Sequence, residues 1–286
     1  MQEIEKQTAR LTMAKTMIGI ILSIFILIIA QLLAFAISEI PLNLGVSGAI
    51  CNVFAGLLYV LFAFLGAAVL CGKFLKLPMQ EMRIPRFGVK SVWIVAAVLM
   101  PLLVLLLSMA VGGRWEINYF DTETTLATIT GAVVFYGMAT GMVEELIFRG
   151  IIMGCLEKRF GIRIAVIVPS VLFGLLHIIG NDLDFVSTIQ LLIAGSMVGI
   201  LFSLIAYESD SIWNNAIVHG IWNMTLVGGI LHIGNQADDS SIFNFVFGNQ
   251  SFLISGGDFG IEASVISVFV YFVFCVLATL VLKRYK

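Results

Sequence analysis

Eight apolar runs constrain this chain more than any other feature of its sequence. They cover residues 17–37, 44–71, 92–111, 125–148, 163–180, 188–207, 211–233 and 263–282. A helix needs about 20 apolar residues to cross a bilayer, and each run reaches or approaches that length. Hydrophobic residues make up 60% of the 286 and charged residues only 12%, against about 25% charged in a soluble domain. We therefore expect an all-α polytopic membrane protein of about eight transmembrane helices.

The basic residues predict how these helices are oriented. Lys and Arg gather in cytoplasmic loops of membrane proteins, and an even number of helices places both termini on one side. The basic residues assigned to the cytoplasm are Lys6, Arg10, Lys15, Lys73, Lys76, Arg83, Arg86, Lys90, Lys158, Arg159, Arg163, Lys283, Arg284 and Lys286. Only Arg114 falls in a connection on the other side. Both termini are therefore expected in the cytoplasm, and the formal net charge of −2 gives no reason to propose a nucleic-acid partner.

The chain is expected to form a single membrane domain, residues 1–286. Residues 1–124 supply the first three helices, and residues 125–233 hold the polar motifs of a catalytic core. Residues 234–286 supply a long outer surface loop and the last helix. The four cysteines lie in apolar stretches without the spacing of metal ligands, so they are interpreted as small buried side chains.

Polar side chains inside three of the runs are the candidates for function. An ionised residue at the bilayer centre costs roughly 2.5–3.5 kcal/mol on insertion scales, so it survives where it is paired, faces the bundle interior or reacts. The candidates are Glu144, Glu145 and Arg149 in the fourth run, Phe173 and His177 in the fifth, and Asn215, His219 and Asn223 in the seventh. If the three helices are neighbours, these groups reach a common depth nearer the cytoplasmic side.

Helical spacing separates the expected roles. Glu145 and Arg149 are four residues apart with the acid first, which is the favoured order for an ion pair on one helix face. Glu144 points about 100° away from that pair and is left free. Gly137 and Gly141 form a small-xxx-small pair that lets another helix approach closely. We therefore predict a structural ion pair beside a free carboxylate.

The free groups fit peptide hydrolysis with water as the nucleophile. A carboxylate and an imidazole can orient one water and accept its proton. A second imidazole and a carboxamide can donate N–H groups to the oxyanion that forms. The same residues also fit two other classes: a non-catalytic binding or regulatory protein, and a proton-coupled transporter. The transporter is disfavoured because the sequence has no inverted repeat and no paired broken helices.

The three motifs resemble those of the CAAX-processing endopeptidase and bacteriocin-processing enzyme family, called CPBP or Abi. The matching strings are Glu144-Glu145-Leu-Ile-Phe-Arg149, Phe173-Gly-Leu-Leu-His177 and His219-Gly-Ile-Trp-Asn223. The resemblance implies an eight-helix fold with a polar cavity open to the cytoplasmic side. It implies Glu144 and His177 as the water-activating pair, and His219 and Asn223 as the oxyanion-stabilising pair, with Glu145, Arg149 and Phe173 in support.

The same resemblance sets the expected partners. Eukaryotic members of the family trim prenylated proteins after the lipidated cysteine, and bacterial members are linked to peptide maturation, bacteriocin self-immunity and membrane-localised regulation. We therefore expect a peptide or lipidated-protein substrate and contact with membrane lipids. The expected location is a bacterial plasma membrane.

Zinc is the one cofactor to weigh, because the family is often labelled a metalloprotease. Glu144, His177 and His219 offer the oxygen and nitrogen donors that zinc accepts. The sequence has no His-Glu-x-x-His helix, which would indicate a zinc protease more strongly. The mechanism with Glu and His needs no metal, so the sequence favours a site without a tightly bound metal.

Overall fold

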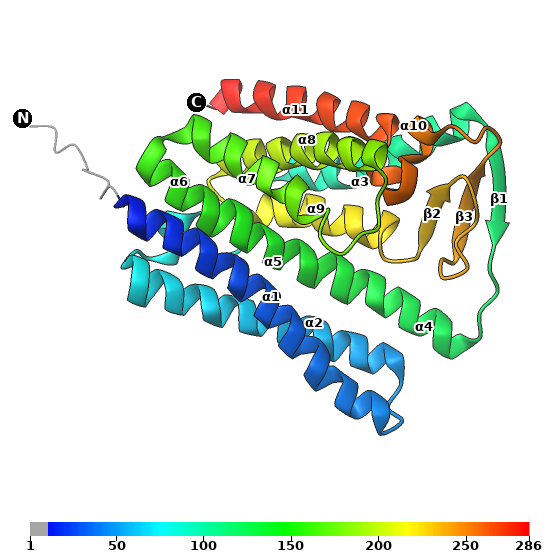
Figure 1. Ribbon diagram of the computed structural model, residues 1–286, viewed down its shortest axis with the longest axis horizontal. Coiled ribbons are helices and arrows are strands. Elements are labelled where there is room, and N and C mark those ends of the chain that lie inside the picture. Colours follow the sequence, from blue (N-terminus) through cyan, green and yellow to red (C-terminus); the bar gives the residue numbers. More distant parts are fainter. Residues whose placement is uncertain (1–10, 286) are drawn as a thin grey trace, which may run out of the picture.

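The computed structural model describes residues 11–285 as a bundle of helices with a small sheet at one end (Figure 1). Among these residues, six helices are long and apolar enough to cross a membrane. They are α1 (Met13–Asn43), α2 (Gly48–Val69) with its extension η1 (Leu70–Leu75), α3 (Ser91–Val111), the helix Thr122–Phe160, α8 (Phe185–Ser209) and α11 (Val265–Tyr285). These six helices confirm the prediction of a polytopic, mostly helical membrane protein.

The other two predicted helices are present but shorter than predicted. Helices α7 (Ile162–Leu176) and α9 (Ile212–Leu226) each have 15 residues. At 1.5 Å per residue each is about 22 Å long, less than the roughly 30 Å of a bilayer core. The chain turns after α7 with Gly180 at φ 85°, and after α9 with Gly229 at φ 82°. The apolar runs continue past the last helical residues, Leu176 and Leu226, which is why the helix ends were predicted too late.

The expectation of an all-α chain missed a three-stranded sheet. Its strands are β1 (Gly113–Ile117), β2 (Leu231–Gly234) and β3 (Phe243–Phe247), in the order β1-β3-β2. Strand β3 pairs antiparallel with β1 and parallel with β2. The segment predicted as a surface loop, 234–262, also holds α10 (Phe252–Ser255) and two 3-10 turns, η5 (Gly257–Phe259) and η6 (Ile261–Ala263). Strand β2 was hidden in the sequence because the apolar run 211–233 continues into it, and β1 and β3 have only five residues each.

The helix Thr122–Phe160 runs along the bundle and is irregular. It consists of α4 (Thr122–Thr130), the π-helical η3 (Gly131–Thr140), α5 (Gly141–Glu145), the π-helical η4 (Leu146–Ile152) and α6 (Met153–Phe160). It ends at Phe160, beyond the apolar run of residues 125–148, and Gly161 follows at φ 85°. Consequently two π-helical segments flank the Glu144-Glu145 pair, and such segments often occur at functional sites.

Small residues bring α9 against this helix. A Cβ added to Gly220 would lie 2.8 Å from the carbonyl oxygen of Gly137, and one added to Gly141 would lie 2.9 Å from the Cα of Gly220. Real side chains do not fit at such distances, so the two backbones approach as closely as glycine allows. The predicted role of Gly137 and Gly141 as a helix-contact pair is confirmed.

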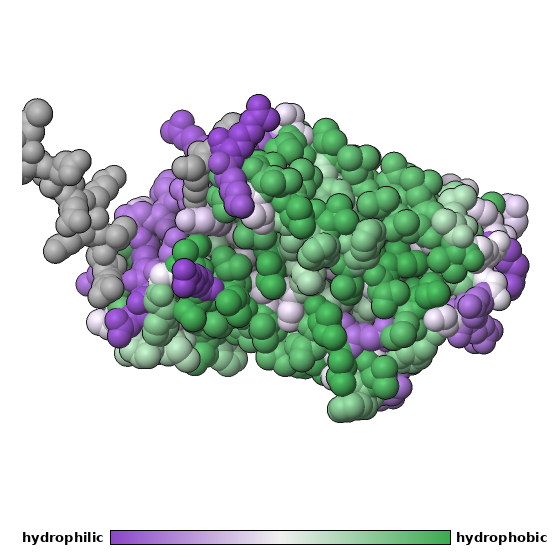
Figure 2. Space-filling view, turned by 90° about the horizontal axis from the view of Figure 1, so that it is seen from above, coloured by the Kyte–Doolittle hydropathy of each residue, from purple (hydrophilic) through white to green (hydrophobic). Residues whose placement is uncertain are grey.

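The two ends of the bundle carry most of the polar surface. The start of α1, the α6–α7 turn and the end of α11 lie at one end, and the sheet lies at the other (Figure 1). On the face that Figure 2 shows, hydrophilic residues gather at both ends and hydrophobic residues cover the surface between. At the first end, Lys158 pairs with Glu81 of η2 (Met79–Met82) at 2.8 Å. Lys6, Arg10 and Lys286, on which the predicted location of the termini partly rests, lie outside the described residues.

Candidate active site

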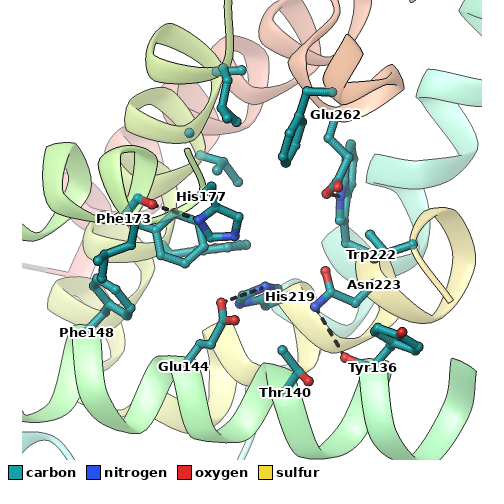
Figure 3. Close-up of a pocket in the computed structure, with 18 of the residues that line it drawn as sticks. Tyr136, Thr140, Glu144, Phe148, Phe173, His177, His219, Trp222, Asn223 and Glu262 are labelled. Atoms are coloured by element: carbon teal, nitrogen blue, oxygen red, sulfur yellow. Dashed lines mark hydrogen bonds and ion pairs between the residues drawn. The ribbon is translucent and has the colours of Figure 1, made fainter. Parts of the chain in front are cut away.

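A cavity of about 530 Å³ lies inside the bundle, and the four predicted catalytic residues all line it (Figure 3). Glu144 comes from α5, His177 from the end of α7, and His219 and Asn223 from α9. Apolar and aromatic side chains from α8 and α11 complete the walls. Four polar groups from three separate segments therefore face one cavity.

The Glu144 carboxylate has a free oxygen in this cavity. Its Oε2 lies 3.7 Å from Nε2 of His219, beyond a direct hydrogen bond. That oxygen is buried and has no hydrogen-bond partner among the described residues. The resemblance paired Glu144 with His177, whereas the imidazole within 4 Å of Glu144 is that of His219. A buried carboxylate oxygen without a protein partner is free to bind a water or a substrate group.

Glu145 is the centre of a buried network. Its Oε1 accepts hydrogen bonds from Arg149 Nη1 at 3.0 Å and from Nδ1 of His219 at 2.8 Å. Its Oε2 accepts a hydrogen bond from the amide of Asn215. The predicted Glu145–Arg149 ion pair is confirmed, with both side chains fully buried. The sequence did not reveal that the same carboxylate orients His219.

The hydrogen bond to Glu145 fixes the orientation of the His219 ring. An ionised carboxylate only accepts hydrogen bonds, so Nδ1 of His219 carries a proton and Nε2 points towards Glu144. The ring stacks on Phe202, with centroids 4.8 Å apart. The imidazole is therefore held on both a polar and an apolar side.

Arg149 connects this network to α8. Its Nη2 donates to the carbonyl oxygen of Gly199 at 3.1 Å. Its guanidinium carbon lies 4.8 Å from the ring centroid of Phe173 and 5.1 Å from that of Phe202. A buried cation is tolerated where an ion pair and aromatic faces surround it. The predicted supporting role of Arg149 thus extends beyond one helix.

His177 presents its other ring nitrogen to the cavity. Its Nδ1 lies 2.8 Å from the carbonyl oxygen of Phe173, which can only accept, so the proton is on Nδ1. The Nε2 atom of a neutral imidazole then carries a lone pair. The ring of Phe173 lies 4.4 Å from that of His177 and 5.9 Å from that of His219. Phe173 therefore contacts both imidazoles.

Asn223 is held at the side of the cavity by η3. Its Nδ2 donates to the carbonyl oxygen of Tyr136 at 3.3 Å (Figure 3). The side chain is buried and lines the cavity beside Trp222. One N–H of the amide remains after the bond to Tyr136.

A protein-family model matches this part of the chain. The model is described as type II CAAX prenyl endopeptidase Rce1-like, and it covers residues 126–225. These residues are an Rce1-like protease domain. The domain runs from α4 to α9 and contains Glu144, His177, His219 and Asn223. It lies inside the predicted core of residues 125–233. A comparison with curated proteins and one with solved structures each found no match.

Segments outside the Rce1-like domain complete the cavity. Gln31 of α1, Phe259 of η5, Glu262 of η6 and Tyr271 of α11 line it as well. Glu262 is the one carboxylate of the cavity that sequence reasoning missed. It accepts a hydrogen bond from the indole Nε1 of Trp222 at 2.7 Å. A single acid in a long polar loop does not stand out in the sequence as a functional residue. It is the fold that places this loop at the cavity of the Rce1-like domain.

The donor atoms of the Rce1-like domain do not fit a zinc site. Within residues 11–285, no three His, Cys, Asp or Glu side chains are grouped so that they could hold a metal ion. Zinc ligands need to converge at about 2 Å on one centre. The set Glu144, His177 and His219 does not form such a cluster.

Proposed function

We propose that this chain is an intramembrane endopeptidase that hydrolyses a peptide bond with a water activated by Glu144 and His177. The observation that carries the proposal is the free Oε2 of Glu144 in the same cavity as two imidazoles. The Rce1-like domain supports it, because the family is one of proteases. No serine or cysteine nucleophile and no metal is required.

The groups divide the reaction between them. Glu144 takes a proton from the water as its oxygen attacks the carbonyl carbon, and Nε2 of His177 orients the water. His219, held between Glu144 and Glu145, donates Nε2–H as an imidazolium to the oxyanion, and Asn223 donates an amide N–H. Glu144 then passes its proton to the leaving amine as the C–N bond breaks. Water is consumed, and a carboxylic acid and an amine are released.

The proposed substrate is a membrane-associated peptide segment, of which a prenylated protein is one kind. His219 is seven residues into α9, about 10 Å from the helix start. That start lies at the end of the bundle with the basic loops, where Ile212 N–H donates to Arg83 O at 2.9 Å. With this end in the cytoplasm, as we propose from the positive-inside rule, cleavage takes place nearer the inner leaflet.

The full chain in lipid nanodiscs provides the test. We would incubate it with a pool of membrane-associated and lipidated peptides and identify new termini by mass spectrometry. Glu144→Gln and His177→Gln should each lower cleavage by about 10³-fold, since each removes a group that acts on the water. Glu123→Gln is the matched control, because Glu123 is an exposed acid in the first turn of the same long helix. Turnover that persists in both cavity variants would exclude the proposal.

A further inference from the structure

Glu262 places a second carboxylate in the cavity, across from Glu144 (Figure 3). It lies outside the Rce1-like domain, in the short turn η6 before α11. Burial and the nearby Glu144 charge raise the pKa of this carboxyl, and together they outweigh the Trp222 hydrogen bond and the imidazoles of His177 and His219, which lower it. The side chain is half-buried and one of its oxygens is bonded to Trp222.

The position of Glu262 is fixed by its neighbours. The Tyr271 hydroxyl donates to the backbone oxygen of Glu262 at 3.2 Å, and the Ser267 hydroxyl donates to that of Ile261 at 2.7 Å. The rings of Trp222 and Tyr271 lie 5.1 Å apart, and both side chains donate a hydrogen bond to Glu262. A group held in this way is preorganised for binding, because little freedom is lost when a ligand arrives.

The charges of the cavity do not balance. Glu145 is neutralised by Arg149, but none of the ion pairs between described residues involves Glu262. Among the described residues that line the cavity, none is Lys or Arg. The imidazolium of the proposed mechanism, His219, lies 3.7 Å from Glu144 and balances that carboxylate, so among the described residues Glu262 is left without a cation. A carboxylate that is partly removed from water and has no cation is costly, so this space favours a cationic group from a ligand and disfavours an anionic one.

We propose that Glu262 binds a cationic group of the substrate, an ammonium or guanidinium, and so determines which peptide is cleaved. This inference rests on the proposed peptidase function and adds the substrate class, a basic peptide segment. A charge-assisted hydrogen bond in such a site corresponds to about 10–100-fold in kcat/KM. The cation comes from a Lys or Arg side chain or from the free amino terminus of the peptide.

Quenched fluorescent decapeptides test this with the full chain in nanodiscs. Each position of the peptide in turn holds Lys, norleucine or Glu. The peptides are made in two series, one with an acetylated amino terminus and one with a free amino terminus. Wild type should cleave the Lys peptide at least about tenfold faster than the norleucine peptide at one position, or should prefer the free-amine series. In Glu262→Gln that ratio should fall to about one, while Gln still accepts the Trp222 hydrogen bond. Glu262→Lys should favour the Glu peptide.

Asp258→Asn is the matched control, since Asp258 is an exposed acid four residues earlier whose Oδ2 accepts the backbone N–H of Asp184 at 3.1 Å. It should keep the wild-type ratio. A ratio near one in wild type, or a preference that survives in Glu262→Gln, overturns the inference and leaves the peptidase function intact. If wild type cleaves neither these peptides nor any of the membrane-associated and lipidated pool, the peptidase function fails. Fluorescence anisotropy of the same labelled peptides then tests the inference. Wild type should bind the Lys peptide more tightly than the norleucine peptide, and this ratio of affinities should fall to about one in Glu262→Gln.

Discussion

At the scale of single residues, one buried carboxylate explains how several polar groups are kept in an apolar bundle. Glu145 accepts hydrogen bonds from Arg149, His219 and Asn215, which come from two different helices. The Glu145–Arg149 pair could be predicted from a spacing of four residues. The contact with His219 could not, because it depends on how α9 is rotated against α5. The second acid of the motif thus positions an imidazole, while Glu144 stays free.

Replacing Glu145 by Gln should therefore destabilise the chain and weaken catalysis together. The amide leaves the Arg149 charge buried without its counterion, which typically costs about 3–5 kcal/mol. Glu116→Gln is the control, because Glu116 pairs with Arg114 at 2.7 Å on the surface, where an ion pair is worth at most about 1 kcal/mol. Unfolding curves in the same lipid measure both variants. Equal losses of unfolding free energy in the two variants would mean that Glu145 does not stabilise the buried network.

Glu262 should make stability depend on pH. Because burial raises its pKa in the folded chain, the folded state binds more protons than the unfolded state between the usual carboxyl pKa and the raised one. Stability then falls as pH rises through that window. Melting temperatures of wild type and Glu262→Gln should agree more closely at pH 4.5 than at pH 8, where the Gln variant should be the more stable. A difference between the two melting temperatures that does not change with pH would contradict this.

At the scale of elements, the site depends on how closely α9 packs against η3 and α5. Gly137, Gly141 and Gly220 form that contact. The helices themselves could be predicted from apolar runs, and the close contact from two glycines four residues apart. The ends of α7 and α9 and the π-helical segments could not, since apolar residues continue through these points. The sheet could not either, because its strands have only four or five residues. A backbone that leaves the helix because of Gly229 looks the same in a hydropathy profile as one that stays helical.

Gly220→Ala should separate these helices and misplace His219 from Glu144. The new Cβ would lie 2.8 Å from the Gly137 carbonyl oxygen, and such overpacking costs about 1–3 kcal/mol. Gly72→Ala is the control, since its Cβ would meet nothing within 4 Å. We expect lower thermal stability and at least about tenfold slower cleavage for Gly220→Ala alone. Wild-type behaviour of Gly220→Ala would show that the site tolerates a wider spacing of α9.

At the scale of the whole molecule, the basic loops lie at one end of the bundle and the sheet at the other (Figure 1). The sequence predicted this separation from its charges alone, because each apolar run reverses the direction of the chain. The cavity could be predicted only in part. Its motif residues carried a signal, whereas Glu262 and Tyr271 reach it from the last 30 residues or so through a fold that no local pattern encodes.

Cysteine labelling tests the orientation that we propose. Lys76 and Asp239 are both exposed and lie in segments near opposite ends of the bundle. The four native cysteines are buried, so they should react little. In intact cells an impermeant maleimide should label Asp239→Cys, and Lys76→Cys should react only after the membrane is opened. Labelling of both from outside would reverse or exclude the assignment.

The central claim is that Glu144 and His177 act on one water in one cavity. A double-mutant cycle of cleavage rates in nanodiscs tests it most directly, with Glu144→Ala, His177→Ala and the double variant compared at equal folding. Groups that act as a unit are strongly non-additive. We predict that each single variant loses about 10³-fold and that the double variant loses hardly more than either one. Losses that multiply in the double variant, or single variants that keep wild-type rates, would contradict the account.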